Sequence, residues 1–553
     1  MCGIFAYIGL GELPDNIDEY FKRIQYRGPD KSNTVTIKYP KCMNRIFLGF
    51  HRLSINDLSD NGLQPMSYIH DPNCYLICNG EIYNCKELKE KYNFETKSNS
   101  DCEIILHMYK KFGIEETVKQ LDGVFAFIIY DENYVFVGRD IIGVRPLFVG
   151  QHEHGDIAFA SEAKSLIPFC SKIDQFKPGH FGIIDLREID DIITCRYILF
   201  QIPFYYIPSI NKELDEVHVI KNIKENLISA VEKRLMSDRP VGCFLSGGLD
   251  SSIICAIMTK LLDKPVVTFS IGMADSNSPD LHYSEIVSKF LKTDHHRVEY
   301  TFDEGFQALD ELIYTLETYD ITTIRASLPQ YLLSKYITEN TDIRVLFSGE
   351  GPDEHFGGYQ YLQKAPSNKE LHNELIKLTT NLHYFDVLRT DRSTAKFGLE
   401  VRVPFLDKKF ITNSFQTPPE YKNSNNRIEK WLIRTAFDDV ENPFLPNEIL
   451  WRKKNAFSDA VGYQWVDRLI EKIDTLITDK ELENANQIYI HNPPETKEGL
   501  YYRKIFNKHY KNKSKLIPYY WMPNNNWFST KITDPSAKTL SCFSDDSNNT
   551  SML

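Results

Sequence analysis

The sequence lacks both long apolar runs and paired cysteines. No stretch of its 553 residues contains the roughly 18 consecutive apolar residues that a membrane-spanning helix needs. The eleven cysteines are scattered, odd in number and never spaced as a CxxC metal or redox pair. The amino terminus also lacks the basic and apolar regions of a signal peptide. We therefore expect reduced thiols, a cytoplasmic location and no membrane partner.

Positive charge is also scarce. The chain has 64 Lys and Arg against 76 Asp and Glu, which gives a net charge of −12. This balance disfavours nucleic acid as a partner, because non-specific binding needs clustered basic side chains. An acidic chain can still bind phosphate through a local glycine-rich loop. The apolar content of 42% is typical of a globular protein, and the length predicts two to four domains.

The first part of the chain, to about residue 195, alternates short strands with turns. Stretches rich in β-branched and aromatic residues predict strands at 45–55, 74–80, 124–131, 134–140, 157–162 and 181–186. Two helices are expected, near 15–26 and 100–112, and Ser100 with Glu103 fits a capping box at the start of the second. This pattern predicts an α+β module of stacked antiparallel sheets.

The second part has a different pattern. A stretch with two prolines at 200–215 is expected to be a linker, followed by an amphipathic helix from about 220 to 235. Apolar strands are predicted at 241–245, 266–271, 295–300 and 343–347, separated by helices. Such alternation predicts a parallel, doubly wound sheet that binds ligands at the carboxyl ends of its strands. Residues 360–525 are expected to be mostly helical, and the polar end of the chain disordered.

A cysteine at position two is the first candidate for chemistry. If Met1 is removed, Cys2 carries a thiol with a pKa near ~8.5 and an α-amine with a pKa near ~7.7–8.0. Such an amine can accept the thiol proton, as in enzymes with an N-terminal nucleophile. The alternative is a small hydrophobe packed in the first strand, and the opening five residues alone favour it.

The stretch 243–258, CFLSGGLDSSIICAIM, carries a phosphate-site pattern. An apolar strand ends at Leu245, Gly247 and Gly248 form a loop, and a helix starts near Asp250. Glycines let backbone N–H groups approach an anion, and the helix start adds a positive dipole. Hydroxyl donors to a phosphate are Ser246, Ser251 and Ser252. The loop lacks the Walker A lysine, and Asp250 beside a phosphate indicates Mg²⁺ between them.

A second loop, VLFSGEGPDEHFGGY at 345–359, follows another apolar strand. It contains Ser348 and Gly349, and then Asp353 and Glu354. Alone, it could be a surface acidic loop. If both strands belong to one parallel sheet, their carboxyl ends meet, and Asp250 and Asp353 could share Mg²⁺.

Several motifs carry a resemblance to a known family. The loop SGGLDSS resembles the pyrophosphate loop of ATP pyrophosphatases. The amino-terminal CGI with RGPD (27–30), HRLSI (51–55), NGEIYN (79–84) and SDCE (100–103) resembles a class II glutamine amidotransferase domain. Both halves in this order resemble the glutamine-hydrolysing asparagine synthetase family, over about residues 1–525. Longer motifs at 317–327, 400–408 and 451–465 support this, and the resemblance identifies Cys2 as the nucleophile.

The resemblance implies roles in glutamine hydrolysis. Cys2 attacks the glutamine amide to form a γ-glutamyl thioester, and the side chain of Asn79 with the Gly80 backbone forms the oxyanion hole. Arg52 binds the glutamine carboxylate and Asp101 its ammonium group. The full glutamine-binding set that the resemblance implies is Arg52, Ile55, Asn79, Gly80, Glu81 and Asp101.

The resemblance also implies roles in adenylation, with ATP as substrate and Mg²⁺ on Asp250 and Asp353. Glu350 positions the intermediate and takes a proton from ammonia, and Lys454 stabilises the α-phosphorus. The ATP-binding set is Leu245, Ser246, Gly247, Gly248, Asp250, Ser251, Ser252, Ile271, Ser348 and Gly349. The aspartate-binding set is Thr322, Thr323 and Arg325. An apolar ammonia tunnel is expected along the domain interface.

Two positions depart from the family pattern. Asn33 replaces a usual glycine, with little expected loss because Asn tolerates the left-handed backbone region. Pro352 replaces a common serine and removes an N–H from a phosphate-facing loop, so ATP affinity could suffer.

The expected architecture is an N-terminal nucleophile type αββα sandwich of antiparallel sheets, followed by a doubly wound α/β domain with a helical C-terminal part. The expected boundaries are 2–200 for the glutaminase domain, 216–525 for the synthetase domain and 526–553 for a disordered tail. The alternatives are a catalytically silent paralogue, or a related adenylating enzyme such as a β-lactam synthetase. Cys2 with the intact RGPD and NGE motifs argues against a β-lactam synthetase, and the presence of Cys2, Asp250 and Asp353 argues against a silent paralogue. SGGLDSS argues against a phosphoribosyl amidotransferase, and a homodimer is the assembly considered.

Overall fold

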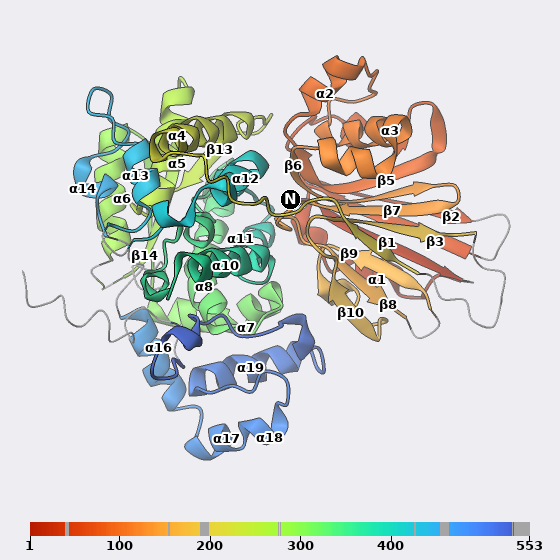
Figure 1. The fold of residues 1–553 in the computed structure, drawn as a ribbon. Helices are drawn as coiled ribbons and strands as arrows, with labels where there is room; N and C mark the ends of the chain where they lie inside the picture. Colours follow the sequence, from red (N-terminus) through yellow and green to blue (C-terminus); the bar gives the residue numbers. More distant parts are fainter. Residues whose placement is uncertain are drawn as a thin grey trace, which may run out of the picture.

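A computed structural model describes residues 1–10, 12–38, 44–152, 155–187, 198–274, 276, 278–424, 427–453, 464–533 and 535. Within these residues two antiparallel sheets are followed by one parallel sheet and a set of helices (Figure 1). The fold class expected from the sequence is therefore confirmed. The division into 2–200, 216–525 and 526–553 stays a prediction.

The first half contains two six-stranded sheets in which all paired strands are antiparallel. In spatial order, the first sheet is β10 (Lys172–Gln175), β8 (Phe148–Gln151), β9 (Ile157–Ala160), β1 (Gly3–Leu10), β3 (Asn44–Arg52) and β2 (Lys31–Lys38). The second sheet is β12 (Phe200–Pro203), β11 (His180–Asp185), β7 (Tyr134–Arg139), β6 (Gly123–Asp131), β5 (Asp71–Ile82) and β4 (Met66–Tyr68).

Alternating side chains of β1 explain how the two sheets stack. Ile4 and Ile8 pack in one cluster with residues of β5 and β6, so they lie between the sheets. Phe5 and Tyr7 point the other way and pack with α1 (Ile17–Lys22). Helices α2 (Cys85–Tyr92) and α3 (Ile104–Gln120) cover the outer face of the second sheet (Figure 1). The result is the expected αββα sandwich.

The parallel sheet has the strand order β15, β14, β13, β16, β17. Its strands are β13 (Val241–Phe244), β14 (Val267–Met273), β15 (Asp294–Tyr300), β16 (Val345–Phe347) and β17 (Glu400–Arg402). The order reverses between β13 and β16, because their other neighbours in the sheet, β14 and β17, lie on opposite sides. In a doubly wound sheet this reversal is where ligands bind, so the fold points to the loops after Phe244 and Phe347.

Helices surround the parallel sheet and extend below it (Figure 1). Those before and between the first strands are α4 (Glu216–Lys233), α5 (Leu249–Leu261), α6 (Pro279–Leu291), α7 (Phe302–Leu316) and α8 (Ile321–Asn340). Those after β16 are α9 (Pro352–Phe356), α10 (Asn368–Thr380), α11 (Asp386–Ala395), α12 (Lys408–Gln416), α13 (Trp431–Ala436), α14 (Asn447–Leu450), α16 (Trp465–Asp474), α17 (Asp479–Glu483), α18 (Ala485–Ile488) and α19 (Lys497–His509). The largely helical carboxyl part was predicted.

Two local predictions differ from the structure. The capping box at Ser100 is absent, because the Glu103 carboxylate instead accepts the backbone N–H groups of Lys97 and Ser98, both at 2.8 Å. The expected linker starts with strand β12, which pairs with β11 at the edge of the second sheet. Its residues Phe200 and Ile202 stay exposed, so no buried alternating pattern indicated the strand.

Two further expectations concern single sites. Asn33 lies in β2 opposite Phe50, so its backbone is extended and no left-handed conformation is required there. In the segment 526–553, which was expected to lack structure, residues 526–533 and 535 are described. The Ile532 N–H donates to Asn525 Oδ1 at 2.7 Å, so contacts hold the start of this segment. The other residues of the segment lie outside the described residues.

Candidate active sites

Cys2 stands directly before the central strand β1 and is held through its backbone. Its N–H donates to Asn79 Oδ1 at 3.0 Å, and its carbonyl accepts from Arg27 Nε at 3.1 Å. Its thiol Sγ lies 3.7 Å from the Leu53 carbonyl oxygen. In this chain with Met1 in place, burial raises the pKa of the Cys2 thiol to about 11. The thiol is therefore protonated at neutral pH in that form.

Met1 is buried at the boundary between the two halves of the molecule. Its side chain is 1% exposed and belongs to an apolar cluster that includes Val124 from β6 and Leu406 from the 3₁₀ turn after β17. Its amino nitrogen lies 3.9 Å from Glu400 Oε2 in β17. Burial also lowers the pKa of this amine.

Asn79 and Gly80, the predicted oxyanion hole, lie in β5 next to Cys2. Asn79 is fully buried, and its side-chain Nδ2 has no hydrogen-bond partner among the described residues. A buried donor without an acceptor is unfavourable unless a ligand supplies one. A Cβ at Gly80 would lie 2.5 Å from the Val124 carbonyl oxygen, so only glycine fits there. The pair can therefore stabilise an oxyanion beside the cysteine.

Glu81 and Asp101 form a buried acidic pair that Asn56 joins. Asn56 Nδ2 donates to Glu81 Oε2 at 2.5 Å and lies 3.4 Å from Asp101 Oδ1. Asp101 Oδ2 also accepts the Ile82 N–H at 2.6 Å. Burial raises the pKa of Asp101 to about 6 and that of Glu81 well above its usual range. Such a pair favours a bound cation, such as an ammonium group.

Arg52 and Ile55, also predicted for glutamine binding, contact other protein groups. The Arg52 guanidinium donates to the carbonyl oxygens of Asp57 and, at 2.5 Å, of Ser59, which fixes its orientation. The Ile55 side chain instead packs with Leu53 and Val345, at the start of β16. The cysteine site therefore contacts the amino end of the parallel sheet.

The RGPD segment links Cys2 to the second half, which the sequence reasoning did not anticipate. Besides Cys2, the buried Arg27 donates to Glu162 at 2.6 Å and to both carboxylate oxygens of Asp391, at 2.8 and 3.0 Å. Glu162 belongs to the first half and Asp391 to α11 of the second. Asp30 of the same segment accepts the Ser54 N–H at 2.8 Å.

The two loops of the parallel sheet contact each other where the strand order reverses. A Cβ at Gly349 would lie 2.6 Å from the Ser251 nitrogen, so the second loop packs directly on the first. Gly247 has φ +70°, and a Cβ there would lie 2.4 Å from the Tyr283 carbonyl carbon. Both glycines are thus required for the loop geometry. The hydroxyl of Ser252 has no partner among the described residues, whereas Ser246 and Ser251 bond to each other at 3.0 Å.

The other residues predicted for ATP surround these loops. Leu245 directly follows the last residue of β13, and its N–H donates to the Phe269 carbonyl oxygen at 2.8 Å. Ile271 is buried within β14, and the Ser348 N–H donates to the Arg402 carbonyl at 2.9 Å. These positions place apolar surface and backbone groups beside the phosphate loop.

Asp250 and Asp353 are brought together by a lysine that the sequence reasoning missed. Lys430 Nζ donates to Asp250 Oδ2 at 2.6 Å and to Asp353 Oδ1 at 2.8 Å. The two carboxylates also hold the pKa of Lys430 above its usual range, against the opposing effect of burial. No group of three His, Cys, Asp or Glu side chains that could hold a metal occurs among the described residues. Two carboxylates near a phosphate loop nevertheless fit Mg²⁺, which commonly uses one or two carboxylates plus substrate phosphates.

Glu350 lies on the second loop and is paired with Arg389 of α11. Arg389 Nη2 lies 2.8 Å from Glu350 Oε2 and 2.7 Å from Asp386 Oδ1. Burial raises the pKa of Glu350, and Arg389 opposes this effect. Pro352 is the first residue of α9, where an N–H has no partner within the helix, so the ring is well accommodated there.

The predicted aspartate-binding residues have different surroundings. Thr322 Oγ1 has no partner among the described residues, whereas Thr323 Oγ1 donates to Asp320 Oδ2 at 2.7 Å. Arg325 Nε donates to Glu498 Oε1 at 2.9 Å in a buried pair. Within the predicted aspartate-binding set, Thr322 is therefore the residue whose hydroxyl has no hydrogen-bond partner among the described residues. Lys454 lies outside the described residues.

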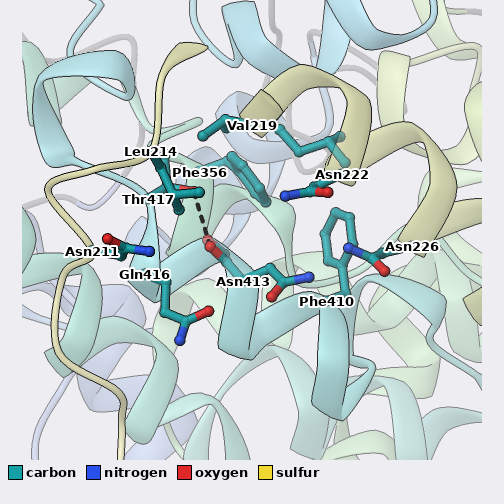
Figure 2. A pocket seen from close by; sticks show the side chains of 12 residues that line it. Asn211, Leu214, Val219, Asn222, Asn226, Phe356, Phe410, Asn413, Gln416 and Thr417 are labelled. Atoms are coloured by element: carbon teal, nitrogen blue, oxygen red, sulfur yellow. Dashed lines mark hydrogen bonds between the residues drawn. The ribbon is translucent and has the colours of Figure 1, made fainter. Parts of the chain in front are cut away.

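A cavity of about 70 Å³ lies away from all these residues, between the segment before α4, α4 itself, α9 and α12. Figure 2 shows the side chains of Asn222 and Asn226 from α4 opposite Asn413 and Gln416 from α12. None of the predicted site residues lines it.

Comparisons with known proteins match both halves. The model of the glutamine amidotransferase domain matches residues 1–185, and that of asparagine synthase matches 222–374 and 363–531. The curated "Asparagine synthetase [glutamine-hydrolyzing]" of Cricetulus griseus is 43% identical over 98% of each chain, as is that of Homo sapiens. A solved glutamine phosphoribosylpyrophosphate amidotransferase from B. subtilis covers 54% of this chain and 81% of its own at 17% identity, with a TM-score of 0.31. That last likeness is too distant to support an argument.

Proposed function

Because this chain belongs to the family of glutamine-hydrolysing asparagine synthetases, it makes asparagine from aspartate with glutamine as the nitrogen donor, and we propose which residues carry each step. Cys2 and its neighbours hydrolyse glutamine, and the loops 246–252 and 348–353 activate aspartate with ATP. The balanced reaction is ATP, aspartate, glutamine and water to AMP, pyrophosphate, asparagine and glutamate.

One arrangement carries the proposal: both sites are built on the same two strands. Leu53 and Ile55, beside Cys2, pack on Val345 at the amino end of β16, and Val241 of β13 lies against them. The phosphate loops leave the carboxyl ends of β13 and β16. Strands of three or four residues span roughly 10–13 Å, so ammonia released at one site has a short way to the other. An apolar tunnel along this way stays a prediction.

For glutamine hydrolysis we assign the groups around Cys2. The thiol attacks the side-chain amide carbon, and the α-amine freed by removal of Met1 takes the thiol proton and passes it to the leaving ammonia. Asn79 Nδ2 and the Gly80 N–H stabilise the oxyanion, and losing one such donor typically costs about 10²–10³ in rate. Water then releases glutamate from the thioester. Glu81 and Asp101 hold the substrate ammonium, and Arg52 its carboxylate.

For adenylation the aspartate β-carboxylate attacks the α-phosphorus of ATP, and pyrophosphate leaves onto the glycine loop. Mg²⁺ bound at Asp250 and Asp353 would neutralise charge on the phosphates. Ammonia then attacks the adenylate, Glu350 accepts its proton, and AMP leaves. Lys454 and Thr322 keep their proposed contacts with the α-phosphorus and with aspartate.

Mass balance on purified protein tests this function. Wild type given Mg-ATP, aspartate and glutamine should form asparagine, glutamate, AMP and pyrophosphate in equal amounts. Cys2→Ala should lose glutamine-dependent synthesis and keep synthesis from ammonium chloride, because only the first site uses the thiol. Glutamine consumption without AMP in the wild type would contradict the proposed second site. Loss of both activities in the wild type would instead favour a silent paralogue.

The affinity for glutamine should fall as the pH drops below about 6. Burial raises the pKa of Asp101 to about 6, so its carboxyl takes up a proton as the pH falls through this value. A protonated Asp101 cannot balance a substrate ammonium, so the KM for glutamine should rise about tenfold per pH unit below 6. Steady-state glutaminase assays from pH 5 to 8 measure this. In Asp101→Asn the KM for glutamine should be high at every pH and should no longer rise below pH 6. If the KM of this variant still rose below pH 6, Asp101 would not be the origin of the pH dependence.

We also propose a cytoplasmic location. The eight cysteines among the described residues, including Cys74 and Cys102, form no disulfide, which fits a reducing compartment. Among the described residues, no helix has the length and apolar character to cross a membrane. A homodimer remains a prediction.

A further inference from the structure

The cavity between α4, α9 and α12 is lined by an unusual number of carboxamide side chains. Asn222 and Asn226 belong to α4, and Asn413 and Gln416 belong to α12 (Figure 2). Asn211, from the segment that leads into α4, is the fifth amide of the lining, and its N–H donates to the Gln416 carbonyl oxygen at 2.8 Å. Three separate parts of the chain therefore present side-chain amides to one space of about 70 Å³.

These amides do not satisfy one another, whereas the hydroxyls of the lining have partners. The Thr417 hydroxyl donates to the Asn413 main-chain carbonyl at 2.9 Å, and Figure 2 shows no bond from one side-chain amide to another. The Ser414 hydroxyl donates to the His355 carbonyl at 2.9 Å. Asn226 is only 7% exposed, so bulk water reaches little of it. A buried amide in this position is unfavourable unless a guest in the cavity completes its hydrogen bonds.

The lining favours a neutral guest with both donors and an acceptor. None of the residues that line the cavity, all of them described, is Asp, Glu, Lys, Arg or His, and an unpaired charge is costly to bury. A carboxamide offers two N–H donors and one acceptor oxygen, so a second carboxamide is its natural partner. The volume equals that of two or three waters at about 30 Å³ each, which matches the three non-hydrogen atoms of a carboxamide. Val219, Phe356 and Phe410 add apolar surface for a short stem.

We propose that this cavity binds the side-chain amide of a free amino acid, asparagine or glutamine, at a site separate from both active sites. Asn211 is exposed, so the charged end of the amino acid can stay in water at this side of the cavity. Phe356 in the cavity wall and Asp353 of the proposed metal site belong to the same short helix, α9. The inference needs only the reaction of the family, and not the residue roles assigned above. The enzyme would thus bind its product or its nitrogen donor at a third place.

The test uses the two amino-acid side chains as separate small molecules. Acetamide corresponds to the side chain of asparagine and propionamide to that of glutamine, and neither carries the charged groups that an amino-acid site recognises. Saturation-transfer NMR on the full-length protein should detect at least one of them, and the tighter one identifies the natural ligand. In Asn226→Leu its affinity should fall at least about tenfold, because a hydrogen-bonding partner is lost. Acetate, the charged isostere of acetamide, should not bind with an affinity that depends on Asn226.

The amino acid itself gives the second measurement. Calorimetry with the identified amino acid, on the Cys2→Ala background so that glutamine is not consumed, should show a binding event that Asn226→Leu weakens at least about tenfold. No binding of either amide, or equal binding by wild type and Asn226→Leu, would show that the cavity holds water only. Acetate binding that is weakened by Asn226→Leu would show an anion site. Each of these results would overturn the proposal.

Two further variants complete the design. Asn222→Leu changes a less buried amide of the same cavity, and it replaces Asn226→Leu if circular dichroism shows that the latter fails to fold. Asn340→Leu is the matched control, because the Asn340 amide is exposed at the end of α8 and donates to the Tyr336 carbonyl at 2.8 Å. It should leave every affinity unchanged. Asparagine formation by the wild type tests the proposed function separately, since the binding measurements need no turnover.

Discussion

A chain that keeps Met1 should lose glutamine-dependent asparagine synthesis by at least about a thousandfold and still use ammonium salts. With Met1 in place, the Cys2 nitrogen belongs to a peptide bond and donates its hydrogen to Asn79, so it cannot accept a proton. Burial also raises the pKa of the thiol to about 11, so about one thiol in a thousand is ionised at pH 8. Both effects remove the nucleophile without changing the second site.

This result can be measured on two samples of the wild-type sequence. One is produced with methionine aminopeptidase inhibited and the other with the peptidase active, and mass spectrometry reports the first residue of each. Glutaminase and ammonium-dependent activities are then compared side by side. Equal glutaminase activity in both samples would show that the α-amine of Cys2 is not the base. A parallel loss with ammonium chloride would show that Met1 disturbs the second site as well.

Arg27→Met should destabilise the protein by about 3–5 kcal/mol and uncouple the two reactions. Arg27 is fully buried and forms ion pairs with Glu162 and Asp391. Its removal leaves these two buried carboxylates with less positive charge around them, which is unfavourable. The same change removes the donor to the Cys2 carbonyl and a link between the two halves of the molecule. We therefore expect a lower unfolding temperature and more glutamate than asparagine per turnover.

Arg187→Met is the control for this change. Arg187 also pairs with an aspartate, Asp185, at 2.7 Å, but its side chain is 55% exposed. Surface pairs contribute up to about 1 kcal/mol, so this variant should melt close to wild type and keep equal yields of glutamate and asparagine. Thermal melts and product analysis at a temperature where each variant is folded separate the two effects. Equal yields in Arg27→Met would contradict a coupling role.

The sequence predicted the parts of the fold that local patterns determine. Stretches rich in β-branched and aromatic residues in the first half, and the apolar strands around SGGLDSS in the second, identified both sheet types, because composition and period report directly on burial. Strand β12 was missed because it is an edge strand whose Phe200 and Ile202 side chains are exposed. It is held by backbone hydrogen bonds to β11, and such bonds leave no pattern of buried apolar residues in the sequence. The capping box at Ser100 was wrong because Glu103 found stronger partners in a neighbouring turn.

The candidate sites were predictable where a motif is contiguous and not where it depends on distant residues. The meeting of Asp250 and Asp353 followed from the parallel sheet, since carboxyl ends of neighbouring strands share one edge. Lys430 was missed because its contact with Asp250 spans 180 residues, and nothing near it in the sequence suggests a ligand. The same is true of Arg27 and Asp391, which are 364 residues apart.

The buried position of Met1 implies an order of events during synthesis of the protein. In the folded chain Met1 is 1% exposed and lies against Glu400 and Leu406, so a peptidase cannot reach it there. If Cys2 is the mature amino terminus, trimming has to precede the docking of the two halves. At roughly 5–20 residues per second, a ribosome reaches residue 400 about 20–80 s after starting. Processing of the nascent chain therefore has a limited time window, and a molecule that misses it is permanently restricted to ammonia.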